Sequence, residues 1–357
     1  FDAALLNLRG RIVAKRRGKA VRPMGREAVH EVHQLISDLV AATGAAPLGI
    51  GVAVPGAVSA DGAVVESVQI GWADLSLRDE LEDVYGIPSY VASDTEAAAV
   101  AEFGRGKSDP DADLLYIKID ERITAAVVTG GEIHRATNRG GDMTHIQVQD
   151  ASGICACGMT GCLGIVANVE AVLGPDFVDL SSDARKGLAA ETTPEVGKAA
   201  RAVGEALAPA VAVLDVERIV LGGAVSELRA VSNLVAESID RMLGWCPDVV
   251  VSGLGDSAAV LGAGGMVLSG ELGVVWAGCR GTADEKQPPW TGAAREQPPR
   301  KGAVLCAIPR TAALRRDRRE GDLRWFSGGV DVPPWVMFQI CRHPTADSIG
   351  LKAETVS

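Results

Sequence analysis

Apolar residues recur at two spacings along the first 273 residues, and these spacings predict alternating strands and helices. Between residues 26 and 42 the apolar positions repeat at helical spacing, and Gly44 then offers the left-handed backbone that ends a helix. Residues 48–54 are a continuous apolar run closed by Pro55-Gly56, which is typical of a strand buried on both faces. The same criteria predict strands at 3–8, 11–14, 89–92, 114–119, 123–129, 218–221 and 249–251, and helices at 95–103, 194–214, 227–243 and 258–268. Because strands alternate with helices, we expect an α/β protein with largely covered sheets, made of two halves that meet near residues 103–113.

The pattern changes near residue 275. The segment 275–357 contains four of the six tryptophans, eight of the 17 prolines and a local charge of +4, against −15 for the residues before it. No period of 2 or 3.6 residues persists there, so no face of a strand or helix can be buried. We therefore expect an irregular, disordered tail that adds nothing to the core.

Composition narrows the class of protein. Hydrophobic residues make up 47% of the chain and charged residues 23%, with a net charge of −11. This is the balance of a globular protein, and the clustered positive charge of a nucleic-acid binder is lacking. No apolar run reaches the roughly 20 residues that span a membrane, and the seven cysteines do not form a disulfide framework. With no secretory signal evident, we expect a cytoplasmic protein that does not itself bind DNA or a membrane.

The strongest local signal for chemistry is a set of four residues, His145, Cys155, Cys157 and Cys162. Three thiols within eight residues, separated by glycines that permit a tight loop, can converge on one ion. One histidine and three cysteines are a common closed tetrahedral set for zinc, and four protein ligands leave no open position for catalysis. The pattern therefore predicts a structural zinc ion. The alternative is a loop of free cysteines that could undergo redox chemistry.

A carboxylate at the end of a predicted strand marks a candidate ligand site. Asp94 follows the strand at 89–92 and precedes the helix at 95–103, which places it at the crevice of an α/β sheet. Residues at such a position also serve as helix N-caps, and Ser93 or Asp94 would suit that purpose well. Local sequence alone favours the cap.

Five segments of the chain form a characteristic series: residues 49–56 (GIGVAVPG), 93–99 (SDTEAAA), 141–145 (GDMTH), 155–163 (CACGMTGCL) and 219–223 (IVLGG). In order and spacing they resemble the ROK family, which contains bacterial sugar kinases and sugar-responsive repressors. The resemblance covers residues 1–273 and rests most on the cysteine block with its upstream histidine. It implies the two-lobed, actin-like ATPase (ribonuclease H-like) fold of hexokinases, with an N-terminal lobe at 1–105, a C-terminal lobe at 106–274 and a sugar between them. It also implies that the helix at 258–268 packs back toward the N-terminal lobe, and that His145 both binds zinc and lies beside the sugar.

Several positions depart from the pattern of the family's kinases. The resemblance implies that the first strand and its phosphate loop are absent, and residues 120–124 lack the glycines of a second phosphate loop. Close approach of backbone N–H groups to phosphate needs such glycines, and Asp120 and Glu121 would repel a triphosphate. The implied sugar-binding residues are Ser93, Asp94, Asp142 and His145, with Gly164 where the family has a glutamate and with Gly222 and Gly223 as a vestigial nucleotide site.

These departures favour binding over catalysis. Asp94 is kept as the residue that would take a proton from a sugar hydroxyl, but phosphoryl transfer depends on positioning and neutralising the phosphates. We therefore expect a sugar-sensing, dimerising effector domain of a ROK-type regulator, whose winged-helix DNA-binding domain is not in this chain. The expected cofactor is structural zinc, without ATP or magnesium, and the expected ligand is a small sugar or amino sugar. The alternatives are a glucokinase-like sugar kinase and a non-functional truncated remnant.

Overall fold

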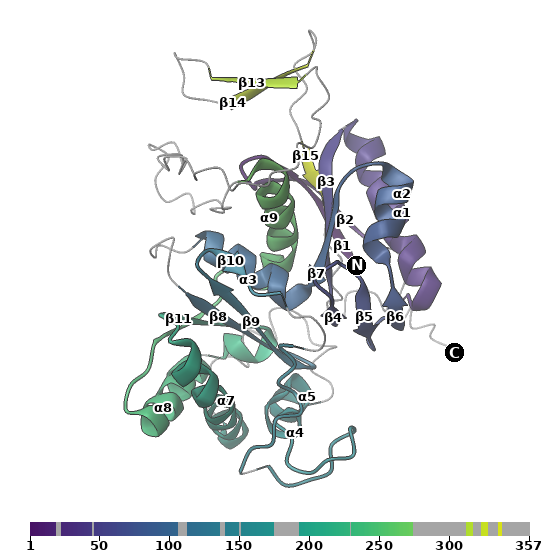
Figure 1. The fold of residues 1–357 in the computed structure, drawn as a ribbon. Coiled ribbons are helices and arrows are strands. Elements are labelled where there is room, and N and C mark those ends of the chain that lie inside the picture. Colours follow the sequence, from purple (N-terminus) through teal and green to yellow (C-terminus); the bar gives the residue numbers. More distant parts are fainter. Residues whose placement is uncertain are drawn as a thin grey trace, which may run out of the picture.

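Two α/β lobes face each other across a pair of packed helices in the computed structural model (Figure 1). The structure describes residues 1–18, 23–44, 46–105, 113–135, 140–149, 151–174, 193–228 and 230–273, and the backbone of residues 312–316, 323–327 and 335–337. The strands and helices predicted up to residue 273 are all present, with ends that shift by a few residues. The α/β class expected from the alternation of elements is therefore confirmed.

The N-terminal lobe is built on a five-stranded sheet in the order β2-β1-β15-β3-β7. Its strands are β1 (Asp2–Asn7), β2 (Ile12–Arg17), β3 (Pro47–Val54), β7 (Ser89–Ser93) and β15 (Trp335–Met337). β2, β1 and β15 are successively antiparallel, whereas β15, β3 and β7 run parallel. Helix α1 (Gly25–Thr43) buries its apolar stripe on one face of the sheet, and it ends at Gly44 with φ of 61°, as the sequence predicts.

A small antiparallel sheet and a short helix follow β3, and the sequence analysis did not predict them. They are β4 (Ala57–Val58), β5 (Val64–Ser67), β6 (Trp72–Leu75) and α2 (Leu77–Tyr85). Each of these strands has two to four residues, which is too short for an alternating pattern to emerge. Gly56 precedes this sheet at a position that favours glycine. Its φ is 153°, and a β-carbon there would lie 2.3 Å from the carbonyl oxygen of Glu66.

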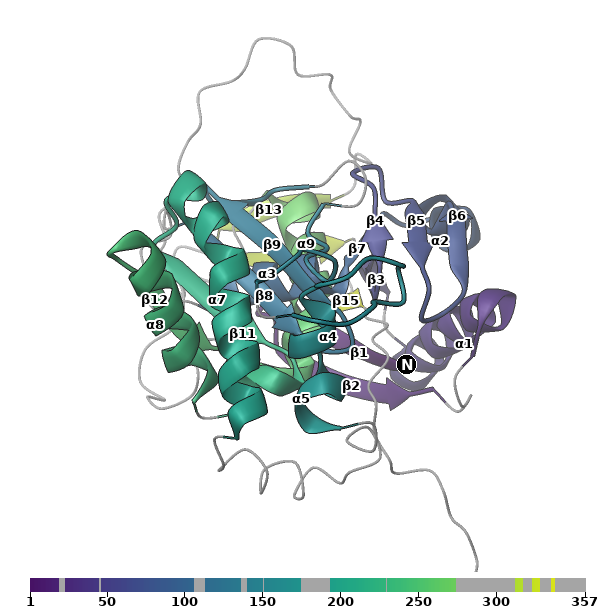
Figure 2. The same ribbon diagram turned by 90° about the horizontal axis from the view of Figure 1, so that it is seen from below.

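The C-terminal lobe is a second five-stranded sheet, in the order β10-β9-β8-β11-β12. Its elements are β8 (Leu114–Ile119), β9 (Ile123–Thr129), β10 (Glu132–Ile133), α4 (Gly164–Ala167), α5 (Val169–Leu173), α7 (Pro194–Leu214), β11 (Arg218–Gly222), α8 (Val231–Leu243) and β12 (Asp248–Val251). Figure 2 shows α7 and α8 side by side on the outer face of the sheet. On that face they pack on alternate residues of β8, including Leu115 and Ile117. The intervening residues Leu114 and Tyr116 face the helices between the lobes.

Helices α3 (Asp94–Arg105) and α9 (Ala258–Leu272) lie between the two sheets. Residues 258–268 are buried on every side of α9, because the helix packs on β3 and β7 of the N-terminal lobe as well as on α3. The helices cross so closely that a β-carbon at Gly262 would lie 1.6 Å from the carbonyl oxygen of Ala97. Although α9 is largely apolar, no helix among the described residues is long and apolar enough to cross a membrane.

Two parts of the chain differ from expectation. The helix predicted at 227–243 begins at Val231, because a 3-10 helix at Ala224–Glu227 follows the sharp turn at Gly223, whose φ is 84°.

In the segment 275–357, expected to be irregular and to add nothing to the core, the structure describes β13 (Ala312–Arg316), β14 (Leu323–Ser327) and β15. β13 and β14 pair with each other, apart from both lobes in Figure 1. β15 lies inside the N-terminal sheet, where the facing edges of β1 and β3 offer backbone partners to a short extended segment.

Candidate functional site

A cavity opens between the lobes, where the carboxyl ends of β3, β7 and β8 come together. This is the edge at which α/β sheets bind their ligands. The N-terminal lobe lines it with residues 55–58, 66, 69 and 93–96, and the C-terminal lobe with residues 118, 120–122, 124–125 and 140–142. Three of the predicted sugar-binding residues, Ser93, Asp94 and Asp142, are therefore brought together from both lobes.

The start of α3 settles which residue caps the helix. The Ser93 N–H donates to Glu96 Oε2 at 3.0 Å, and the Glu96 N–H donates to Ser93 Oγ at 3.1 Å. This reciprocal pair is a capping box, and it uses the Ser93 hydroxyl as an acceptor for the helix. The capping prediction is thus confirmed for Ser93, while the Asp94 side chain is left for the cavity.

Asp94 is held by a lysine of the opposite lobe. Its Oδ2 accepts a hydrogen bond from Lys118 Nζ at 2.8 Å, and its Oδ1 accepts one from Thr95 Oγ1 at 3.2 Å. Only 7% of Asp94 is exposed. Lys118 Nζ also lies 3.6 Å from Asp120 Oδ2, so its ammonium group is shared by two carboxylates. The other oxygen of Asp120 is buried and has no hydrogen-bond partner within the described part of the chain.

Asp142 is paired in a similar way. Its Oδ2 accepts a hydrogen bond from the Arg122 guanidinium, and its Oδ1 accepts one from the Thr144 N–H at 3.1 Å. Burial raises the pKa of Asp142, but the hydrogen bonds from Thr144 and the charge of Arg122 outweigh it, so the net pKa lies below its usual value. Each candidate ligand carboxylate therefore has its own cation inside the cavity.

Lys118 and Arg122 are two cations of the cavity wall to which the sequence analysis assigned no role. Lys118 interrupts the otherwise apolar strand at 114–119 one residue before its end, which was a usable signal. Arg122 lies in the turn that joins β8 to β9, where a charged residue is unremarkable in sequence. Their partners are 24 and 20 residues away in the chain, so the pairing arises only in the folded lobes.

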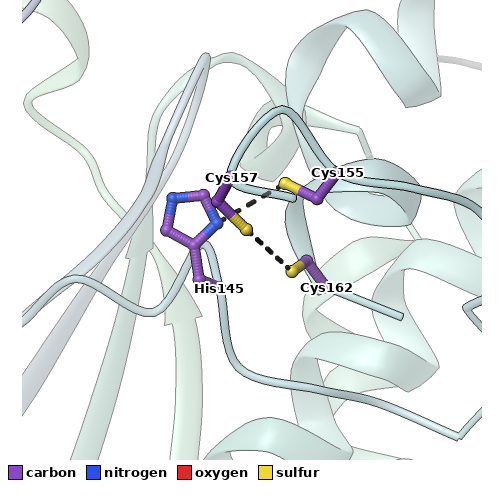
Figure 3. A group of neighbouring side chains, drawn as sticks. All are labelled: His145, Cys155, Cys157 and Cys162. Atoms are coloured by element: carbon purple, nitrogen blue, oxygen red, sulfur yellow. Dashed lines mark hydrogen bonds between the residues drawn. The ribbon is translucent and has the colours of Figure 1, made fainter. Parts of the chain in front are cut away.

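The second site is the loop that carries the predicted metal ligands. The side chains of His145, Cys155, Cys157 and Cys162 converge, and their ligand atoms all lie within 4.8 Å of one another (Figure 3). Cys155 Sγ is 3.5 Å from His145 Nδ1, and Cys157 Sγ is 3.6 Å from Cys162 Sγ. Glycines 153, 158 and 161 have positive φ values of 142°, 87° and 79°, which confirms why the loop needs them.

The four ligand atoms fit a zinc ion. With Zn–S bonds of about 2.3 Å and a Zn–N bond of about 2.0 Å, tetrahedral geometry sets S···S at about 3.8 Å and S···N at about 3.5 Å. Burial and the neighbouring thiols Cys157 and Cys155 raise the pKa of Cys162 to about 12, which is the response of thiols crowded together without a compensating cation. The cluster is therefore consistent with a zinc site.

The metal loop is attached to the wall of the cavity by backbone hydrogen bonds. The Gly164 N–H donates to the carbonyl oxygen of Thr144 at 2.8 Å, and Thr144 in turn donates to Asp142. A β-carbon at Gly164 would lie 2.7 Å from Thr144 Cγ2, so this chain has no space for a larger side chain there without a shift. His145 is not among the described residues that line the cavity, and its predicted contact with a sugar stays a prediction.

The glycine pair at the end of β11 lies outside this lining as well. Gly222 ends the strand, and a β-carbon there would lie 1.9 Å from the hydroxyl oxygen of Tyr116. Gly223 has a positive φ of 84°, and its β-carbon would lie 2.4 Å from the carbonyl oxygen of Ile119. Both glycines are explained by close packing at the turn, and their vestigial nucleotide role stays a prediction.

Two α/β lobes that enclose a polar cavity, with α3 and α9 between their sheets, define an actin-like ATPase fold, and the Cys₃His loop narrows that class further. Residues 1–269 match the ROK family, and the chain belongs to it. The resemblance drawn from the five sequence segments is therefore confirmed, as is the expected fold.

Relatives of the chain include both kinases and regulators. The glucokinase of Halalkalibacterium halodurans is 29% identical over 266 residues, which cover 66% of this chain and 78% of that protein. The xylose repressor of Bacillus subtilis is 27% identical over 129 residues, only 35% of this chain and 33% of the repressor. Two such different relatives leave the branch of the family unresolved.

Solved structures of a ROK-family kinase and of a ROK-family regulator both share the fold of this chain. A ROK-family glucokinase from Streptomyces griseus, in complex with glucose and AMPPNP, aligns with a TM-score of 0.59 at 21% identity over 73% of this chain and 97% of that chain. A ROK-family transcriptional regulator, a homologue of the Escherichia coli Mlc protein, aligns with a TM-score of 0.65 at 22% identity over 77% of this chain and 76% of that chain. At these identities the likeness shows the fold.

Proposed function

We propose that this chain is a sugar-binding effector domain of a ROK-type regulator, and that the cavity between the lobes is its ligand site. The observation that carries the proposal is the pairing of both candidate ligand carboxylates with cations, Asp94 with Lys118 and Asp142 with Arg122. These pairs hold two strong hydrogen-bond acceptors in position for sugar hydroxyls. Lys118 and Arg122 act as positioning residues in this arrangement.

The same pairing argues against phosphoryl transfer. A triphosphate needs cations and backbone N–H groups that are free to approach its oxygens. Lys118 and Arg122 are both committed to carboxylates, and the turn between β8 and β9 adds Asp120 and Glu121 to the cavity wall. The resulting local charge is negative, so we expect an unphosphorylated sugar or amino sugar as ligand, without ATP or magnesium.

Zinc has a structural role in this proposal. His145, Cys155, Cys157 and Cys162 would hold the ion as a closed site, and the hydrogen bond from Gly164 to Thr144 would transmit its rigidity to Asp142. DNA binding would belong to a separate winged-helix domain, and the effector domain would form a homodimer. Sedimentation analysis of the purified chain tests the dimer, which a monomer at all concentrations would contradict.

A glucokinase-like activity is the second candidate. It is favoured by the match to the Halalkalibacterium halodurans glucokinase, which covers 78% of that enzyme, whereas the matched repressor is covered over about a third of its length. In that case Asp94 would act as the base that accepts the proton of the sugar hydroxyl. A remnant without function is the third candidate, with the metal loop serving only to hold the fold.

Calorimetry and a coupled kinase assay separate the three candidates. The zinc-loaded wild type is titrated with a panel of pentoses, hexoses, N-acetylhexosamines and hexose 6-phosphates, and the same sugars are assayed for ATP-dependent phosphorylation. The matched variants are Asp94→Asn in the cavity and Asp83→Asn, which alters an exposed carboxylate of α2. Binding without turnover supports the proposal, turnover that disappears only in Asp94→Asn supports a kinase, and neither supports a remnant.

A further inference from the structure

The three cysteines of the metal loop differ in their access to solvent. Cys155 and Cys162 are buried, with 8% and 0% of their surface exposed, whereas Cys157 is exposed. Cys157 lies in a tight turn that is closed by a hydrogen bond from the Cys155 N–H to the carbonyl oxygen of Met159 at 2.7 Å. Residues 156–160 of this turn are all exposed. A small oxidant dissolved in water therefore reaches Cys157 before the other two thiols.

A buried thiol lies within reach of Cys157. Its Sγ is 3.6 Å from Cys162 Sγ (Figure 3), and a disulfide bond is about 2.05 Å long, so the two sulfurs need to approach by about 1.5 Å. Cys162 is held in place by an isolated β-bridge to Gln147. Cys157 is next to Gly158, and among the described residues no atom lies within 4 Å of the place where a β-carbon of Gly158 would be. The movement can therefore come from the exposed turn.

We infer that Cys157 is an oxidation site, at which a peroxide forms a disulfide with Cys162 and so removes the ability of the loop to hold zinc. Cysteines that bind a metal are thiolates, and the thiolate is the form that reacts with peroxides. The other two ligands, His145 and Cys155, form a separate pair whose Nδ1 and Sγ atoms are 3.5 Å apart. They take no part in the reaction.

The reaction has two steps and uses one molecule of hydrogen peroxide. The Cys157 thiolate attacks one peroxide oxygen, so that an S–O bond forms, the O–O bond breaks and hydroxide leaves, which oxidises the sulfur to a sulfenic acid. The Cys162 thiolate then attacks that sulfur, so that the S–S bond forms, the S–O bond breaks and a second hydroxide leaves. Two protons from solvent convert both hydroxides to water. In sum, two thiolates are oxidised to a disulfide and the peroxide is reduced to water.

Oxidation removes two of the four metal ligands. His145 and Cys155 remain, and two ligands do not make a closed zinc site. The chain leaves the loop through Gly164, whose N–H donates to the carbonyl oxygen of Thr144, and Thr144 in turn donates to Asp142 in the cavity. A loop without its metal should hold this connection less firmly. The effect on sugar affinity rests on the proposed function, whereas the disulfide and the loss of zinc do not.

Peroxide treatment of the zinc-loaded, full-length chain tests the inference without any sugar. After free thiols are blocked, peptide mass spectrometry should find Cys157 joined to Cys162 and Cys155 still free. A chromogenic chelator should detect zinc released at least about tenfold faster than from untreated protein, and a dithiol should reduce the disulfide and restore zinc binding. Dimedone, which traps sulfenic acids, should label Cys157 when it is added together with the peroxide.

Two variants form a matched pair, because Cys157→Ser and Cys155→Ser each remove one thiol ligand from the loop. Under peroxide, Cys155→Ser should still form the disulfide between residues 157 and 162, whereas Cys157→Ser should keep Cys162 as a free thiol. Cys246→Ser changes a cysteine outside the cluster and should release zinc under peroxide at the wild-type rate.

Three results would overturn the inference. The first is oxidised wild type in which Cys157 is joined to a cysteine other than Cys162 or to none, which is measured even if the variants do not fold. The second is dimedone on Cys155 or Cys162 while Cys157 is unlabelled. The third is a protein that forms the disulfide and keeps its zinc. Absence of sugar binding would count against the proposed function alone.

Discussion

Replacing Asp94 with asparagine is the most direct test of the cavity. The substitution keeps the shape of the side chain and one oxygen, but it removes the negative charge that faces Lys118 at 2.8 Å. Hydrogen bonds to charged groups contribute about 1.5–3 kcal/mol and neutral ones about 0.5–1.5 kcal/mol. Each sugar hydroxyl that donates to Asp94 should therefore lose about 1–1.5 kcal/mol, which is about a tenfold weaker affinity. Two such hydroxyls give up to about 100-fold.

The fold should tolerate this change. Lys118 keeps Asp120 as a neighbour at 3.6 Å, and the asparagine oxygen can still accept from Lys118 or Thr95. We expect the free energy of unfolding to fall by about 1 kcal/mol, the difference between a charged and a neutral hydrogen bond. Calorimetric titration with the sugar that the wild type binds measures the affinity, and urea unfolding measures the stability of Asp94→Asn and of the Asp83→Asn control.

The sugar affinity of folded Asp94→Asn decides whether Asp94 binds the ligand. If folded Asp94→Asn binds the sugar as tightly as the wild type, Asp94 is not a ligand residue, and the cavity must use other acceptors. If it loses affinity only because it unfolds, the urea curve shows a loss far above 1 kcal/mol. A double-mutant cycle with Lys118→Met measures how much the contact between Asp94 and Lys118 contributes to the free energy of unfolding. Because the two side chains are in contact, we expect the effects of the two substitutions on stability to be non-additive.

Three further predictions concern the metal, the second ion pair and the reaction. Purified wild type should contain one zinc ion per chain, and Cys157→Ala should lose it while Cys246→Ala, outside the cluster, keeps it; a metal-free wild type would contradict the site. The pKa of Asp142 is lowered in the folded state, so its stabilising contribution is present above its unfolded pKa of about 3.9 and is lost as pH falls through the folded value. Arg122→Gln should therefore lower the free energy of unfolding in urea by about 1 kcal/mol at pH 7 and by progressively less below about pH 4. A loss of stability that does not change with pH would contradict the predicted role of the Arg122–Asp142 pair. No sugar in the panel should be phosphorylated from ATP in a coupled assay, and turnover lost in Asp94→Asn would overturn that.

The sequence by itself determined the class of fold and the metal ligands. Spacing of apolar residues is a local property, so strands and helices such as α1 and β3 follow from it with small shifts at their ends. The four metal ligands lie within 18 residues of chain, so their convergence needs only a tight loop with glycines where φ is positive. Both features could be predicted because they depend on residues that are close together in the chain.

Only the tertiary structure decided which side chains pair in the cavity and which segment completes the N-terminal sheet. The cap at Ser93 is local, because Glu96 completes it three residues later, but the ion partner of Asp94 is Lys118, which reaches it from the other lobe. Segment 335–337 has no repeat that predicts a strand, and it is one because β1 and β3 leave unpaired backbone on either side of it. Partners that are distant in the chain supply the energy in both cases, and a local pattern contains no information about a partner that folding alone brings into contact.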